Sequence, residues 1–220
     1  MTEYNEMLAL AALAIHADKP DDLEMALIFP AADAEGYISC IGPDFAGHNG
    51  IGFLHMAVWV GAEKCAQRLL DLGANPSCAD GTGKTPLHLA AWRNMARMTE
   101  LLLGAGAPVG SQDATGMAPL HMAAMYDSVR AAGALFKGGA DVNQQDNLGG
   151  TPLHWAAQKG RLVMAEFLIK HGGDKTLTNI SGSTPEDMAR RQGMDETAEF
   201  LAGSGKRYPP SSFKGPGLKK

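Results

Sequence analysis

The sequence predicts an all-α repeat solenoid, in which about five to six helix-turn-helix units joined by β-hairpin loops stack side by side. A Thr/Ala-Pro-Leu-His motif occurs at residues 85–88, 118–121 and 151–154, so its histidines are 33 residues apart. The same spacing relates glycines and alanines along the chain: Gly50, Gly83, Gly116, Gly149 and Gly182, with Ala57, Ala90, Ala123, Ala156 and Ala189. An internal period of this length indicates repeats that each contact only their neighbours.

Within each unit, particular residues predict where its two helices begin and end. Proline at the first helical turn costs no hydrogen bond, because the N–H at that position has no helical partner. We therefore expect first helices to begin at Pro86, Pro119, Pro152 and Pro185. Small alanines let these helices approach closely, and leucines cover the buried face of the second helix. A glycine in the left-handed conformation then ends the second helix, at Gly73, Gly106, Gly139 and Gly172, and an aspartate begins the next hairpin, at Asp80, Asp113 and Asp146.

The period divides the chain into a body and two ends. The predicted repeats are 47–79, 80–112, 113–145, 146–178 and the C-terminal cap 179–202. Residues 1–46 are predicted to form a degenerate capping repeat, with helices over 7–16 and 21–29 and an irregular connector after them. Residues 203–220 are rich in Pro, Gly and Ser and are predicted to be a disordered basic tail.

The motif and its period resemble the ankyrin repeat. The resemblance covers residues 47–201 in five registers, with Gly52-Phe53 replacing Thr-Pro in the first and Glu186-Asp187 replacing Leu-His in the last. It implies that His55, His88, His121 and His154 each tie their own turn to the neighbouring repeat by hydrogen bonds, and Asp187 takes this position in the last register. It also implies that partners meet a concave face, built from the hairpin tips and the exposed side of the first helices.

Composition and charge narrow the class of protein. With 45% hydrophobic and 20% charged residues the chain should fold, and its formal charge of −5 disfavours nucleic acid as the main partner. The first 35 residues hold eight acids against one base, whereas the tail holds five bases and no acid. No segment approaches the roughly 18 apolar residues of a membrane span, and the acidic start differs from a signal peptide. We expect a monomeric cytoplasmic protein with reduced cysteines; the alternative is nuclear localisation through the basic tail.

Three patterns that suggest chemistry have a simpler structural interpretation. The four regularly spaced histidines lie one per repeat, too far apart for the roughly 2 Å bonds of a shared metal site. The segment 81–85, Gly-Thr-Gly-Lys-Thr, resembles the end of a phosphate-binding loop, but Cys78 stands where that loop needs glycine, so a hairpin tip is favoured. Cys65 falls among apolar residues at helical spacing and is assigned to the core. We therefore predict no metal, no cofactor and no catalytic residue.

The residues after each Ala-Ala or Ala-Val pair predict a binding surface. An ordinary solvated face would carry Lys, Glu and Gln, but here these positions carry aromatic residues, Met and Arg, which is the composition of interface hot spots. With the adjoining hairpins, the predicted partner-binding residues are Ile51, Trp59, Val60, Lys84, Trp92, Arg93, Met117, Met125, Tyr126, Leu148, Gln158 and Lys159. The alternative is that the tryptophans pack back against neighbouring repeats. Trp155 takes the buried leucine position of its helix and is assigned to the core.

These features predict a non-enzymatic scaffold or adaptor that binds a partner protein on the concave face. An alternative within this class is an inhibitor or effector that blocks a partner enzyme by occupying it. A second class is an enzyme or sensor with a site in residues 30–49, which contain Cys40, Asp44 and His48. A third interpretation is a module of a larger protein that encodes catalysis elsewhere. Scattered polar residues without an orienting pattern argue against the second class.

Overall fold

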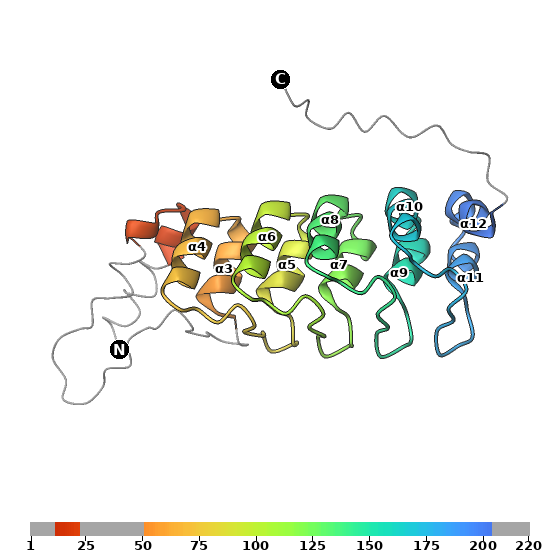
Figure 1. The fold of residues 1–220 in the computed structure, drawn as a ribbon, viewed down its shortest axis with the longest axis horizontal. Coiled ribbons are helices and arrows are strands. Elements are labelled where there is room, and N and C mark those ends of the chain that lie inside the picture. Colours follow the sequence, from red (N-terminus) through yellow and green to blue (C-terminus); the bar gives the residue numbers. More distant parts are fainter. Residues whose placement is uncertain (1–11, 23–50, 204–220) are drawn as a thin grey trace, which may run out of the picture.

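The structure, a computed structural model, describes residues 12–22 and 51–203. Within residues 51–203, helices pair in chain order and the pairs form a single row (Figure 1). The first helices, which we call inner helices, are α3 (Phe53–Val60), α5 (Pro86–Trp92), α7 (Pro119–Met125), α9 (Pro152–Gln158) and α11 (Pro185–Arg191). The second, outer helices are α4 (Glu63–Asp71), α6 (Ala96–Gly104), α8 (Val129–Lys137), α10 (Leu162–Lys170) and α12 (Asp195–Ala202). This arrangement confirms the predicted all-α solenoid.

The helix boundaries follow from residues that the sequence repeats. Proline is the first residue of four inner helices, as predicted, and Thr85 is the N-cap of α5. Each outer helix then stops where a glycine takes a positive φ, as Gly106 does at 89°. Its N–H and that of Ala107 bond to carbonyls of the last helical turn, on Leu103 and Leu102, so the helix end has no unmet acceptor there.

Between the inner and outer helix of a pair, one residue in the left-handed region turns the chain. Glycine serves at three of these positions, but Asn94 has a φ of 56° and Asp127 a φ of 59°. Asn94 uses its side chain as well, because its Oδ1 accepts the N–H groups of Arg130 and Ala131 at the start of α8. The turn of one repeat thus caps the outer helix of the next.

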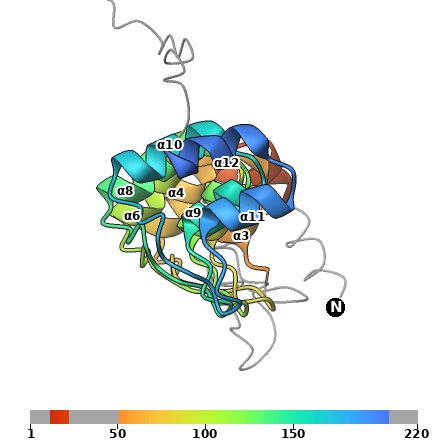
Figure 2. The same ribbon diagram turned by 90° about the vertical axis from the view of Figure 1, so that its right-hand side faces the viewer.

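The loops between repeats extend to one side of the helices as a row of hairpin-like turns (Figure 2). In the loop before α5, Asp80 N–H donates to the Lys84 carbonyl at 2.8 Å. Neighbouring tips are also joined, since Ala114 N–H donates to the Thr82 carbonyl at 3.0 Å. In the part of the chain that is described, these loops contain turns and bends, and the one bridge residue is Gly52. The predicted hairpins are therefore single hydrogen-bonded turns.

Small and branched side chains fill the interior between the two layers. Ala90 and Ala91 on α5 are fully buried, as are Leu102 on α6 and its counterparts on the other outer helices. The core continues past α3, because Ala14 and Ile15 in the helical residues 12–16 are also buried in it. Asp18 Oδ1 accepts the N–H of Cys65 in α4, which fixes this segment to the stack. The remaining parts of the predicted N-terminal repeat and the basic tail lie outside the described residues.

Candidate functional site

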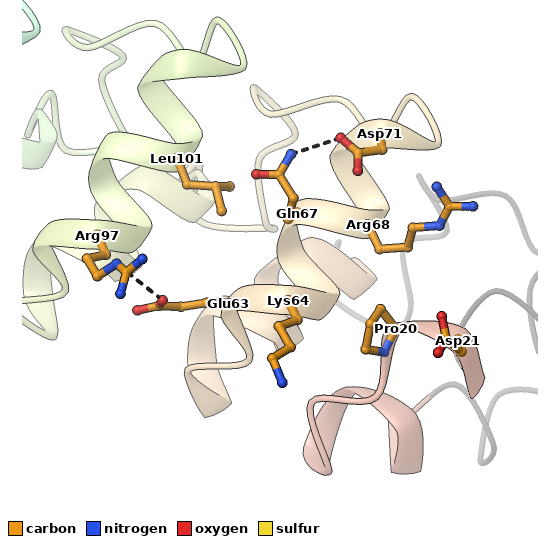
Figure 3. A pocket seen from close by; sticks show the side chains of 9 residues that line it. All are labelled: Pro20, Asp21, Glu63, Lys64, Gln67, Arg68, Asp71, Arg97 and Leu101. Carbon is orange, nitrogen blue, oxygen red and sulfur yellow. Dashed lines mark hydrogen bonds and ion pairs between the residues drawn. The ribbon is translucent and has the colours of Figure 1, made fainter.

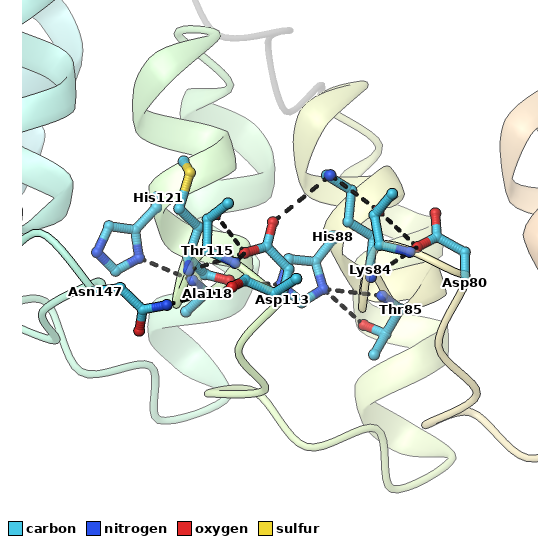
Figure 4. A network of polar contacts seen from close by, with 12 residues as sticks. Asp80, Lys84, Thr85, His88, Asp113, Thr115, Ala118, His121 and Asn147 are labelled. Carbon is cyan, nitrogen blue, oxygen red and sulfur yellow. Dashed lines mark hydrogen bonds and ion pairs between the residues drawn. The ribbon is translucent and has the colours of Figure 1, made fainter.

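The four motif histidines form a ladder that joins each inner helix to the next loop (Figure 4). His121 is typical: its Nδ1 accepts the backbone N–H of Ala118 at 3.0 Å, and its Nε2 lies 3.0 Å from the Gly150 carbonyl oxygen. His55, His88 and His154 bond in the same way to the carbonyls of Lys84, Met117 and Ser183. Because Nδ1 must accept, Nε2 must carry the proton and donate. Both nitrogens are therefore engaged, and neither has a lone pair to give to a metal ion.

Burial also holds this histidine ladder neutral. Desolvation lowers the pKa of all four rings below the ordinary 6.5, although the hydrogen bond to the carbonyl opposes the shift. A protonated ring would turn its Nδ1 from an acceptor into a donor facing another N–H. The role predicted for these histidines is thus confirmed as structural. At the end of the stack, Asp187 instead accepts the N–H and hydroxyl of Thr184 in its own turn.

A second ladder, of Asp80, Asp113, Asp146 and Asn179, shapes the hairpin tips. Asp113 Oδ1 accepts the N–H and hydroxyl of Thr115 and the N–H of Met117, at 2.6 to 3.1 Å. Its Oδ2 lies 3.7 Å from the ammonium nitrogen of Lys84 on the preceding hairpin (Figure 4). These bonds hold the pKa of Asp113 below its usual range against the opposing effect of burial. The segment 81–85 is therefore a hairpin tip whose lysine is held by its neighbour.

Three aromatic rings from consecutive inner helices form a continuous surface, which we call the aromatic strip: Trp59, Trp92 and Tyr126. The ring centroids of Trp59 and Trp92 are 5.3 Å apart and those of Trp92 and Tyr126 are 5.7 Å apart, both pairs in tilted or edge-on contact. Trp59 is 51% exposed and Tyr126 46%. The guanidinium of Arg93 lies 5.7 Å from the centre of the Trp59 ring, within range of a cation–π interaction. Large apolar rings therefore line up across three repeats and face solvent.

Exposed apolar side chains also lie on the hairpins. Leu148 is exposed, and Ile180 on the next hairpin is 71% exposed. The two are adjacent, since Ile180 N–H donates to the Leu148 carbonyl at 3.0 Å. Sequence reasoning identified Leu148 and missed Ile180, although Ile180 occupies the tip position of Asn147 one repeat later, which was the available signal.

The structure brings most of the predicted binding residues to the surface of the inner helices and hairpins. Those that are exposed are Ile51, Trp59, Val60, Arg93, Tyr126, Leu148 and Lys159. Those that are half-buried are Lys84, Trp92, Met125 and Gln158. Trp92 loses exposure because rings on both sides cover it, so the packing alternative describes part of its surface.

Two predicted placements were wrong. Met117 is 8% exposed, because its N–H and carbonyl bond to Asp113 and His88 and its side chain turns into the core. Its side chain is not available to a partner. Trp155 is half-buried and packs against the core rather than within it, and its indole N–H donates to Asp146 Oδ2 at 2.7 Å. This tryptophan thus supports the hairpin before α9.

An open groove of about 600 Å³ lies on the outer-helix side, between residues 20–21, α4 and α6 (Figure 3). Its lining mixes charges, and several of them satisfy one another. Arg97 lies 3.7 Å from Glu63, and Gln67 donates to Asp71 at 2.8 Å. Such pairs leave the groove without a charge of one sign or an apolar floor, so it does not resemble a ligand site.

The two described cysteines have structural contacts. Burial raises the pKa of Cys65 to about 12, and its thiol donates to the Ala14 carbonyl, which fits the predicted core position. Cys78 Sγ lies 3.7 Å from Nδ1 of His55. In the next repeat the hydroxyl of Thr85 takes this place beside His88, and Gly52 cannot supply a hydroxyl in the first. The alternative site with Cys40, Asp44 and His48 lies outside the described residues.

Comparison with known proteins was informative for the family. A family model described as Ankyrin repeats (3 copies) matches residues 54–146 and 133–209. No curated protein matches the chain. Among the described residues, no helix is long and apolar enough to cross a membrane.

Proposed function

Because this chain belongs to the ankyrin-repeat family, we propose that it is a non-enzymatic scaffold that binds a partner protein on its concave face. The proposed contact residues are the aromatic strip and the exposed hairpin residues beside it. Ankyrin repeats generally mediate protein–protein interaction, so the coarse function follows from the family. The scaffold role and this site are our proposal.

The observation that carries the proposal is the continuity of the aromatic strip. Isolated exposed apolar residues are normal on a protein surface, whereas a contiguous set marks an interaction site. Here Trp59, Trp92 and Tyr126 contact one another across three repeats, and Arg93 adds a cation beside them. Trp, Tyr and Arg are the residues that most often dominate binding energy in alanine scans.

A pull-down followed by a binding measurement tests the site. The intact chain and a Trp59→Ala/Trp92→Ala/Tyr126→Ala variant are used as baits in a native lysate, after both are shown to melt alike. The protein recovered by the intact chain is then purified, and its affinity for each form is measured by calorimetry. With each lost ring worth about 1–2 kcal/mol, we expect binding to weaken about 100-fold or more.

The matched control is a Phe136→Ala/Val163→Ala variant, which removes exposed apolar side chains from the outer helices. Its affinity should stay within about twofold of the intact chain. Equal binding by the aromatic variant would exclude the strip as the site. Adding the chain to the purified partner, if that partner is an enzyme, then distinguishes a scaffold from an inhibitor by the change in the partner's activity.

A further inference from the structure

Resting on the proposed function, we propose that the segment bound by this face is an acidic polypeptide with apolar side chains at one end. Its apolar side chains would cover the aromatic strip, and its carboxylates would pair with Arg93, Lys159 and Arg191. We call these three residues the basic row.

The repeat register assigns the basic row to the same surface as the strip. The positions of Trp59 and Val60 recur every 33 residues, so each of the five inner helices contributes two side chains there. The ten are Trp59, Val60, Trp92, Arg93, Met125, Tyr126, Gln158, Lys159, Arg191 and Gln192. Three are basic and none is acidic, although the whole chain has a net charge of −5. The nearest acid in sequence, Asp127, is half-buried one position further on.

The basic row is also available to a partner. Arg93, Lys159 and Arg191 are exposed, and none of them forms an ion pair with a described residue. Elsewhere on the surface the pattern differs: Arg97 pairs with Glu63, and Arg190 pairs with Glu186 at 2.8 Å. Positive charge is therefore left uncompensated on the face that also exposes aromatic rings, which is complementary to a segment that carries both acids and apolar groups.

The order of residues along the stack gives the bound segment a polarity. Apolar and aromatic side chains dominate α3, α5 and α7, whereas Gln158, Lys159, Arg191 and Gln192 make α9 and α11 polar and basic. Because the helices stand in a row in chain order (Figure 1), a segment lying along them meets the strip first and most of the basic row afterwards. Its apolar residues and its acids should then be separated along its own sequence.

Single-stranded nucleic acid would also use aromatic rings and cations, but the geometry fits it less well. The rings of the strip already contact one another, with centroids 5.3 and 5.7 Å apart, so no base can enter between them. Three cations on a chain with an acidic balance also give a weak field for phosphates. Polypeptide is therefore the better occupant.

Selection from a phage-displayed library of random 16-residue peptides on the full-length protein tests the proposal. We expect the selected peptides to be enriched in Asp and Glu, with aromatic or aliphatic residues toward one end. Synthetic copies of the best binders are then titrated by fluorescence anisotropy. A Lys159→Glu/Arg191→Glu variant, which leaves the strip intact, should weaken binding about tenfold or more, and added salt should weaken binding to the unmodified chain.

The control is a Lys137→Glu/Lys170→Glu variant, which makes the same charge change at the ends of outer helices α8 and α10 and should alter affinity less than about twofold. Selected peptides without acid enrichment, or equal weakening by both charge variants, would overturn the inference. If those peptides still lose binding to the Trp59→Ala/Trp92→Ala/Tyr126→Ala variant, the proposed function stands. Binders that ignore the aromatic variant, or a library without binders, would count against the site as well. Tight binding of a labelled 16-nucleotide single strand, lost on reversal of Lys159 and Arg191, would replace polypeptide by nucleic acid.

Discussion

Replacing His121 by alanine should destabilise the stack more than most single substitutions, because its ring bonds to two buried backbone groups. The change removes the acceptor of the Ala118 N–H and the donor to the Gly150 carbonyl, each 3.0 Å away. A buried polar group that loses its partner costs about 1–3 kcal/mol. The ring itself is fully buried, so its removal also leaves a cavity. We expect the free energy of unfolding to fall by about 3–5 kcal/mol.

Urea unfolding followed by both circular dichroism and tryptophan fluorescence measures this loss. Two probes are needed because long repeat arrays can unfold in parts, and a single free energy is defined only where both transitions coincide. His55→Ala offers an internal comparison. The Gly52 N–H lies 3.4 Å from its Nδ1, a longer contact than in the other repeats, so this variant should lose less stability.

The control is His171→Ala on the outer side of the stack. His171 is half-buried, and its ring bonds to the Phe167 carbonyl in the same helix, so its loss should cost under about 1 kcal/mol. If His121→Ala costs no more than His171→Ala, the ladder does not tie the repeats together and the reasoning is wrong.

Three further predictions concern pH, backbone and thiols. The pKa of each ladder histidine is lower folded than unfolded, so the unfolded chain takes up protons first and stability should fall as pH drops below 6.5, by up to about 1.4 kcal/mol per histidine per pH unit; urea midpoints between pH 7.5 and 5.5 that do not decrease would contradict this. Gly116→Ala should cost more than Gly182→Ala in a thermal melt. Both have positive φ, but only at Gly116 would a Cβ approach the Asn147 backbone nitrogen, to 2.5 Å. Cys65, with a pKa of about 12 and full burial, should react with a thiol reagent only after denaturation, and mass spectrometry of the labelled native protein showing Cys65 modified would refute its core assignment.

The local structure could be predicted from the sequence because each unit repeats its own signals. Proline, glycine and the motif histidine act within a few residues of their position or on the next unit, and the same neighbour follows each unit. That is why the helix starts, the glycine stops and the histidine bonds were all predicted. Asn94 shows where this approach ends: its cap on α8 depends on a residue 36 positions away that no motif identifies.

Exposure could not be predicted in the same way. Ile51, Lys84 and Met117 occupy the same register position, 33 residues apart, yet Ile51 is 45% exposed, Lys84 is half-buried against Asp113, and Met117 is nearly buried. Whether a side chain at that position turns outward depends on the size and charge of residues on the adjoining hairpins.

The sequence by itself determined the architecture, the direction of the stack and the histidine ladder, because a strict period fixes which groups meet. Only the tertiary structure decided that Trp59, Trp92 and Tyr126 touch, that Ile180 joins Leu148, and that Met117 and Trp155 face where they do. The physical reason is that the period sets backbone positions, whereas the exposed fraction of a side chain is set by packing against its particular neighbours.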